Sequence, residues 1–167
     1  MRSVMFACVA CGVVAATPAY SQAAKFVERF GDWMAYASDA GGKKICFAVS
    51  EPKDMKPKGV KRGPVYFYIS EWPAEKVSGE ISVKMGYPLK EGNDVEVKIG
   101  GDTFKLFVKD EGAYVESADT EKKLVEAMKK GSTMVIQGRS TRGTLTTDEY
   151  SLSGATAALD RSQTECK

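Results

Sequence analysis

Histidine is absent from all 167 residues of this sequence. Imidazole is the usual general base of Ser–His–Asp sites and a common zinc ligand. The absence of histidine therefore excludes His-based catalytic triads and the usual zinc sites, which contain histidine. The sequence also lacks a G-x-S-x-G element, a Walker phosphate loop and a G-x-G-x-x-G motif. A hydrolase that uses paired carboxylates or a Ser–Lys pair needs no histidine and is therefore not excluded, but no motif points to one. We therefore predict a non-catalytic protein without a metal ion or another cofactor.

Long apolar runs are confined to the N-terminus. The run Val4–Ala16 is followed by a Thr-Pro break and by Ser21-Gln22-Ala23, which places small residues where a signal peptidase reads. We interpret residues 1–23 as a secretory signal peptide, with Ala19 as a second cleavage point. The run is shorter than the stretch of about 20 residues that spans a bilayer, and no later run approaches that length. Residues 24–167 are thus expected to form one exported domain without a transmembrane segment, in the periplasm or at the outer surface.

The sequence has no large excess of charge of either sign. It contains 24 Lys+Arg and 22 Asp+Glu residues, which gives a formal net charge of +2. A protein that neutralises nucleic-acid phosphates normally carries a strong positive excess. Aromatic side chains beside lysines can resemble a stacking platform for single strands. Export and charge balance nevertheless argue against nucleic acid, and we expect a protein or a glycan as the partner.

Cysteine is scarce, and two of the four cysteines lie in the signal peptide. Cys46 and Cys166 remain, and an even pair in an exported protein indicates one disulfide bond. The chain-entropy model gives a link across so long a loop a stabilisation of about 4 to 5 kcal/mol. Two buried free thiols are the alternative. A metal pair is disfavoured because histidine is absent.

Apolar and polar residues alternate in short runs separated by turn residues. This pattern is typical of antiparallel β-sandwiches and barrels. We predict a sandwich of immunoglobulin-like architecture, without the Cys…Trp…Cys spacing of antibody domains. Its core is expected to contain Trp33, Ile81, Val97, Leu106 and Ile136. The predicted strands cover residues 34–37, 44–49, 62–73, 80–87, 95–99, 104–108, 113–116, 133–137 and 147–152.

One helix is predicted to interrupt the strands at residues 119–130. Ser117 or Asp119 can cap its N-terminus, and a glycine follows its last turn. Residues 155–166 are expected to form a second helix or a tail that returns the last cysteine to the sheet. Residues 50–63, which contain two prolines, are expected to form a long loop.

Aromatic residues crowd the strand at 62–73, whose sequence is RGPVYFYISEWP. Because side chains alternate along a strand, Phe67 and the aliphatic residues share one face, and Tyr66, Tyr68 and Trp72 share the other. Tyrosine and tryptophan are enriched where interfaces concentrate binding energy, so the second face could be an exposed docking patch. Alternatively, the helix or the C-terminal tail covers it as a second packing layer. We slightly favour the covered face.

The segment EPKDMKPKGVKR, at residues 51–62, sets five basic residues against two acids. It could attract acidic glycans or anionic lipid headgroups by long-range steering, which makes it the second candidate contact surface. The favoured interpretation is a solvated loop, since exposed charges more than a Debye length of about 8 Å apart are largely screened. The basic residues are Lys53, Lys56, Lys58, Lys61 and Arg62.

The hydroxyl-rich segment 138–152 contains Ser140, Thr144 and Asp148, which could be assembled into a polar binding edge or a hydrolytic site. A β-hairpin that turns at Gly143 is the favoured interpretation, because threonine is common in strands.

Eight sequence landmarks extend over nearly the whole exported chain. They are GDW at 31–33, CFA at 46–48, RGPVYFYIS at 62–70, GYPLKEG at 86–92, TFKLFVKD at 103–110, AMKKGSTM at 127–134, RGTLTTDEYSLSG at 142–154 and the terminal Cys166. Together they resemble the invasion-associated locus B family of exported bacterial proteins. In one respect the sequence departs from the family pattern, which often has a cysteine where Ala37 stands here. The disulfide pattern of the founding members therefore does not transfer.

The resemblance implies a β-sandwich, a periplasmic or surface location and, for the founding members, a role in the entry of pathogens into red blood cells. It implies no catalytic residue. We predict an exported, virulence-associated protein that contributes to host-cell invasion or adhesion by binding a macromolecule. The alternative is a periplasmic housekeeping protein that binds a small ligand or assists other exported proteins.

Overall fold

The computed structural model describes residues 23–167, which form one large antiparallel sheet and two α-helices. The mainly β fold class is therefore confirmed. The predicted signal peptide lies outside the described residues except for its last position. The strands are β1 (Lys25–Phe30), β2 (Trp33–Ala40), β3 (Lys43–Ser50), β4 (Asp54–Lys56), β5 (Tyr66–Trp72), β6 (Val77–Lys84), β7 (Val95–Ile99), β8 (Asp102–Lys109), β9 (Gly112–Tyr114), β10 (Thr133–Arg139) and β11 (Leu145–Ser151).

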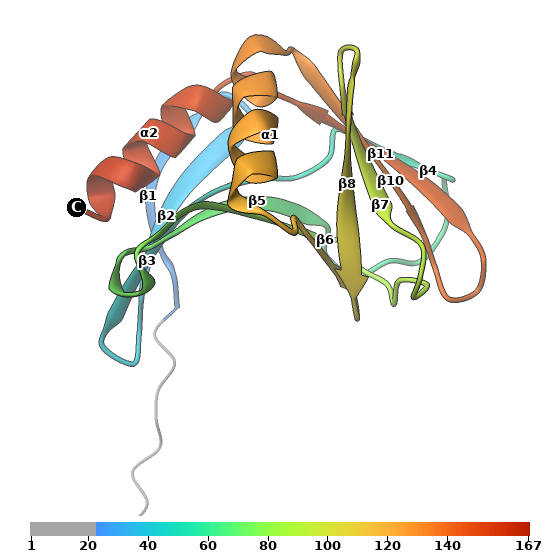
Figure 1. The fold of residues 1–167 in the computed structure, drawn as a ribbon, viewed down its shortest axis with the longest axis horizontal. Helices are drawn as coiled ribbons and strands as arrows, with labels where there is room; N and C mark the ends of the chain where they lie inside the picture. The colour runs from blue at the N-terminus through green and yellow to red at the C-terminus, as the bar shows by residue number, and fades with distance from the viewer. Residues whose placement is uncertain (1–22) are drawn as a thin grey trace, which may run out of the picture.

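The sheet has 11 strands in the order β1-β2-β3-β5-β6-β9-β8-β7-β10-β11-β4, and strand β8 belongs to both of its halves. The first part of β8, residues 102–106, pairs with β7, and residues 107–109 pair with β9. The sheet bends at this shared strand, so its two halves face each other in a sandwich-like arrangement. Figure 1 shows β1, β2 and β3 on the left and β7, β10, β11 and β4 on the right.

Buried side chains from both halves form one core. The ring of Phe67 in β5 contacts that of Tyr150 in β11, with centroids 6.2 Å apart. Trp33 is fully buried at the start of β2, and its indole N–H donates a hydrogen bond of 2.9 Å to the carbonyl oxygen of Ser151. The predicted core is confirmed, because Trp33, Ile81, Val97, Leu106 and Ile136 are all 0% exposed.

Both predicted helical segments are present, as α1 (Ala118–Lys130) and α2 (Ala155–Glu165). Ser117 is the N-cap of α1, because its hydroxyl oxygen accepts a hydrogen bond of 3.3 Å from the backbone N–H of Thr120. Leu124 and Met128 project from α1 into the core. Helix α1 contacts β6, β8 and α2, while α2 packs on β1, β2, β3 and β5.

The two edge strands, β1 and β4, are absent from the predicted set. Side chains of β1 are mostly exposed, and those of β4 are exposed apart from the half-buried Asp54, so neither strand shows the alternation that indicates burial. Strand β4 pairs with β11, with Met55 opposite Asp148. The prediction of an unbroken loop over residues 50–63 is therefore wrong. An edge strand is held by backbone hydrogen bonds to one neighbour, and these leave little trace in the side-chain pattern.

Candidate binding surface

The side chains of strand β5 alternate between the core and the outer face of the sheet. Phe67 is fully buried, whereas Tyr66 and Tyr68 on the opposite face are half-buried. Both helices pack on the Phe67 side, because Leu124 of α1 and Leu159 of α2 belong to the same buried cluster as that ring. Neither helix covers the tyrosine face, so the slightly favoured prediction of a second packing layer made by them is wrong.

The outer face carries a continuous line of aromatic rings across four strands. Successive ring centroids in this line lie 5.6, 5.5, 5.8 and 5.7 Å apart. Such spacing is that of rings in mutual contact. We call this line the aromatic row; it consists of Phe26 in β1, Tyr36 in β2, Phe47 in β3, and Tyr68 and Tyr66 in β5.

The register of strand pairing produces the row. Phe26 lies opposite Tyr36, and Tyr36 lies opposite Phe47 with their rings stacked at 12°. Phe47 is opposite Ser70, two residues from Tyr68, so the next contact is diagonal. Burial raises the pKa of Tyr68 above its ordinary value, and its hydroxyl remains a protonated donor at neutral pH. The row is an apolar surface with a polar edge, and its rings hold one another in place.

A second aromatic pair lies further along the same face. Tyr114 of β9 and Phe107 of β8 are opposite each other, with ring centroids 5.6 Å apart. Ser82 of β6 lies between Tyr68 and Tyr114 and is paired with both. An open depression of about 560 Å³ occupies this position. We call it the tyrosine slot; it is lined by Tyr68, Ser82, Lys84, Lys109, Gly112 and Tyr114, with Val83, Asp110 and Glu111.

Trp72 does not join the two predicted tyrosines. Among residues 23–167 the rings that contact Tyr68 are those of Phe47 and Tyr66, and Trp72 lies four residues further along the strand. Its side chain is partly buried, and its indole N–H is buried without a hydrogen-bond partner among residues 23–167. The two tyrosines of the predicted patch therefore belong to the aromatic row and Trp72 does not, while a role of Trp72 in binding stays a prediction.

The lysines of the predicted basic loop are neutralised in part by two nearby carboxylates. The Lys53 ammonium nitrogen lies 2.7 Å from Asp32 Oδ1, and this hydrogen bond lowers the pKa of the Asp32 carboxyl. Lys58 pairs with Asp54, whose pKa is also lowered, and Lys56 lies 3.8 Å from the same carboxylate. Because Lys56 and Lys58 share one carboxylate, these ion pairs reduce the positive charge of the loop but do not remove it.

Arg62, the fifth basic residue of the loop, is in the core rather than at the surface. Its two terminal nitrogens lie 2.6 and 2.7 Å from the carboxylate oxygens of Asp148, and it also donates to the Met85 carbonyl at 2.8 Å. Its guanidinium carbon lies 5.0 Å from the centre of the Tyr87 ring. The prediction of Arg62 as a surface contact is wrong; among the described residues, Lys61 is the loop cation without an ion pair.

The hydroxyl-rich segment forms the predicted hairpin of β10 and β11. At its turn the Ser140 hydroxyl accepts a hydrogen bond of 3.1 Å from the Thr144 backbone, and Gly143 has the positive φ of 88° that the turn requires. Asp148 lies four residues beyond Thr144, in the ion pair with Arg62. The three polar residues are each used by the fold and do not converge on a reaction centre.

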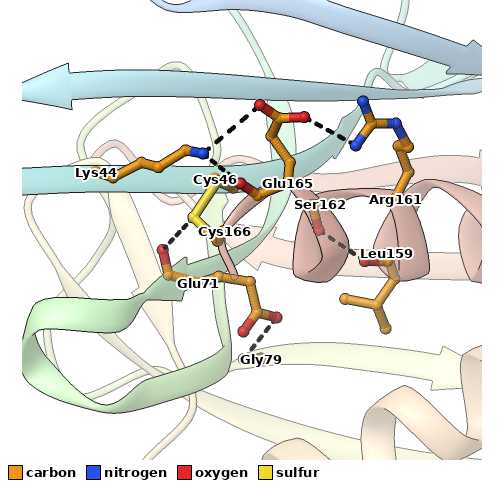
Figure 2. Close-up of a disulfide and its surroundings, with 9 residues drawn as sticks. All are labelled: Lys44, Cys46, Glu71, Gly79, Leu159, Arg161, Ser162, Glu165 and Cys166. Atoms are coloured by element: carbon orange, nitrogen blue, oxygen red, sulfur yellow. Dashed lines mark hydrogen bonds and ion pairs between the residues drawn. A yellow bond between two sulfur atoms is a disulfide. The ribbon is translucent and has the colours of Figure 1, made fainter.

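The predicted disulfide between Cys46 and Cys166 is present, with its two Cα atoms 5.7 Å apart across a separation of 120 residues. It joins the C-terminal end of α2 to β3, on the core side of the sheet. Figure 2 shows Glu165 beside it, between Lys44 and Arg161. The bond therefore fixes α2 to the face opposite the aromatic row.

Residues 23–167 contain neither a cluster of metal-binding side chains nor a membrane-spanning helix. No three His, Cys, Asp or Glu side chains lie close enough to hold a metal ion there. No helix in this part of the chain is long and apolar enough to cross a bilayer.

Comparison with known proteins identifies a family. The family model for "Invasion associated locus B (IalB) protein" matches residues 33–163. No curated protein and no solved structure matches the chain. The matched range contains the tyrosine slot and the aromatic row apart from Phe26, and it contains Cys46 but ends before Cys166.

Proposed function

The chain belongs to the invasion associated locus B (IalB) family, and from this membership we propose that it is a non-catalytic envelope protein that contributes to host-cell adhesion or invasion by binding a macromolecule. Membership supports an exported protein of the IalB type, and the Cys46–Cys166 disulfide agrees with an oxidising compartment. We place the protein in the periplasm or at the outer surface.

The aromatic row carries this proposal. Packing in the core explains why Phe67 and its buried neighbours are apolar. It does not explain why five aromatic residues lie on the face that both helices leave uncovered. At one end of the row Phe26 is 51% exposed, and beyond its other end Phe107 is 46% exposed. The rings between them are half-buried, and partly exposed apolar surface that is continuous in this way marks interaction sites in soluble proteins.

The rings are suited to binding because they are already ordered. Each ring of the row packs against a neighbour, so little side-chain freedom is lost when a partner covers it. Tyrosine also offers a hydroxyl at the edge of an apolar body, which allows contacts with mixed surfaces. We expect the binding energy to come mainly from Tyr36, Phe47 and Tyr68 at the centre of the row.

The basic loop is assigned a minor role. Lys53, Lys56 and Lys58 have carboxylate partners, and Arg62 is buried with Asp148. Long-range attraction by this segment is consequently weak, and exposed charges are screened further by salt. Binding should therefore change little when NaCl is raised from about 0.15 to 0.5 M.

The test uses a fluorescently labelled exported chain, residues 24–167, with red blood cells and with isolated bacterial envelopes. We expect saturable binding that Tyr66→Ser with Tyr68→Ser weakens at least about tenfold. Leu145→Ser is the matched control, since it removes a 49% exposed apolar side chain from β11. Circular dichroism melts verify that all variants fold. Binding to neither target, or equal binding by the double variant, contradicts the proposal; binding to envelopes alone favours the housekeeping alternative.

A further inference from the structure

The tyrosine slot has two aromatic walls and a small residue between them. Tyr68, Ser82 and Tyr114 lie side by side on β5, β6 and β9. Adjacent strands are about 4.8 Å apart, so the two tyrosine Cα atoms are separated by about 10 Å. Because the serine side chain is short, the space between the two walls stays open, as the depression of about 560 Å³ shows. The slot can therefore admit one flat ring-shaped group between, or across, the tyrosines.

A glycine fixes one wall of the slot. A Cβ atom at Gly112 would lie 2.5 Å from the hydroxyl oxygen of Tyr114 and 2.8 Å from its ring carbons. The Tyr114 ring therefore lies back over Gly112, where any other residue would displace it. Phe107 supports the ring from the far side. The slot is a consequence of the local sequence and not an accidental gap.

The rim of the slot is polar but has no charge excess. Lys84 and Lys109 lie on either side of Gly112, and Asp110 and Glu111 follow in the turn between β8 and β9. These four side chains form no ion pair with one another or with other residues in the described range 23–167. Their donors and acceptors are thus available, and two positive charges balance two negative ones.

This combination points to the chemistry of the ligand. A pyranose ring has an apolar face of C–H groups and a rim of hydroxyls, so it can lie against an aromatic ring and exchange hydrogen bonds with ammonium and carboxylate groups around it. Because Lys84 and Lys109 are balanced by Asp110 and Glu111, the rim favours neither an anionic nor a cationic ligand. A protein segment is less suitable, because the centres of protein interfaces are depleted in Lys, Asp and Glu.

We propose that the outer face binds a neutral, pyranose-based oligosaccharide, with one sugar unit in the tyrosine slot and its neighbours along Tyr66 and Phe107. This inference rests on the proposed function, because it names the class of macromolecule that the outer face recognises. The sugar could belong to a glycan of a host cell or of the bacterial envelope, and both present the same chemistry to the slot.

The experiment is saturation-transfer difference NMR with the exported chain, residues 24–167, and defined probes. The neutral probes are maltotetraose, cellotetraose and lacto-N-tetraose, and a sialylated lacto-N-tetraose is the anionic comparator. We expect at least one neutral probe to bind. Tyr114→Ala removes one wall and Ser82→Phe fills the slot, and each should weaken binding about tenfold or more. Phe26→Ala, at the distant end of the aromatic row, should change the affinity less than about twofold.

Several outcomes overturn the glycan assignment. These are an absence of binding to all neutral probes, binding of the sialylated probe alone, or slot variants that bind as well as the parent chain. A second arm separates this assignment from the proposed function. If red blood cells whose surface pyranose rings have been opened at their vicinal diols by excess periodate still bind the chain in a Tyr66- and Tyr68-dependent way, the partner is not a neutral glycan: the glycan inference fails and the proposed function stands.

Discussion

Arg62 and Asp148 form a bidentate ion pair inside the sandwich, although 86 residues separate them in the sequence. The side chain of Arg62 is 6% exposed and that of Asp148 is 0% exposed. Arg62 immediately precedes the segment that enters β5, and Asp148 lies in the centre of β11. The pair therefore joins the aromatic half of the sheet to the opposite half.

Removal of one partner of this pair should destabilise the fold strongly. Asp148→Ala leaves the Arg62 guanidinium buried without its counter-charge, and broken buried pairs of this kind typically cost about 3–5 kcal/mol. Urea unfolding followed by tryptophan fluorescence measures the loss. The double variant Arg62→Met with Asp148→Leu removes both charges and should recover most of it. A loss below about 1 kcal/mol for the single variant would contradict this role.

The disulfide should stabilise the whole fold and hold the C-terminal helix α2 on the sheet. Replacement of Cys46 and Cys166 by serine releases a loop of 120 residues, for which the chain-entropy model predicts a loss of about 4 to 5 kcal/mol. Hydrogen exchange should also speed up in α2, whose docking on β2 and β3 loses its covalent anchor. An unchanged urea midpoint in the double variant would show that burial of the helix is sufficient.

Two glycines with similar backbone conformations should respond differently to alanine. Gly154 and Gly143 have φ values of 91° and 88°. A Cβ atom at Gly154 would collide with the carbonyl oxygen of Phe30, whereas one at Gly143 would meet nothing within 4 Å. We expect Gly143→Ala to cost about 1 kcal/mol from the left-handed backbone alone, and Gly154→Ala to displace β1 or prevent folding. Equal thermal midpoints for the two variants would contradict the close approach of these segments.

Glu121 should make stability depend on pH in a definite direction. Burial, and then the neighbouring charge of Glu80, raises the pKa of its carboxyl in the folded chain, although the hydrogen bond from the Ile81 N–H opposes this shift. A raised folded-state pKa means that the folded chain binds the proton more tightly. Ionisation of Glu121 therefore costs stability as the pH rises through this pKa, and the cost disappears as the pH falls below the unfolded value near 4.5.

Glu121→Gln should accordingly raise the thermal midpoint at pH 7 by about 1–2 °C and leave it unchanged near pH 3.5. Glu126→Gln on the same helix is the control with the opposite sign, because the hydrogen bond from Lys129 lowers the pKa of Glu126. It should lower the midpoint slightly at pH 7, and this difference should also vanish in acid. A Glu121→Gln variant that is less stable at pH 7 would show that its hydrogen bond outweighs its burial.

Much of the fold could be predicted from the sequence, because its strands and helices carry local signals. Alternation located the inner strands, Ser117 marked the start of α1, and two cysteines in an exported chain indicated the disulfide. Strands β1 and β4 gave no such signal, since they lie at the edges and bury little. The sequence also did not predict that β8 pairs with β7 in one half of the sheet and with β9 in the other. The alternation of residues along one strand does not specify which strands it pairs with.

The candidate site was predictable only in part. Tyr66 and Tyr68 could be assigned to one face from β5 alone, but Tyr36, Phe47 and Tyr114 join them through cross-strand register. An alternation count over residues 33–37 and 44–49 would have placed Tyr36 and Phe47 opposite the core positions. The burial of Arg62 could not be foreseen in this way, because its partner lies 86 residues away and the segment around it is rich in lysine.

The central claim is that the chain binds its partner through the outer aromatic face. Hydroxyl-radical footprinting of the exported chain, free and bound to red blood cells or bacterial envelopes, tests it directly. We predict that binding protects Tyr36, Phe47, Tyr66, Tyr68 and Tyr114, while oxidation of Met55 in β4 and of Leu145 in β11 is unchanged. Protection of β4, β11 or the helices, with the aromatic residues oxidised as in the free chain, would contradict it.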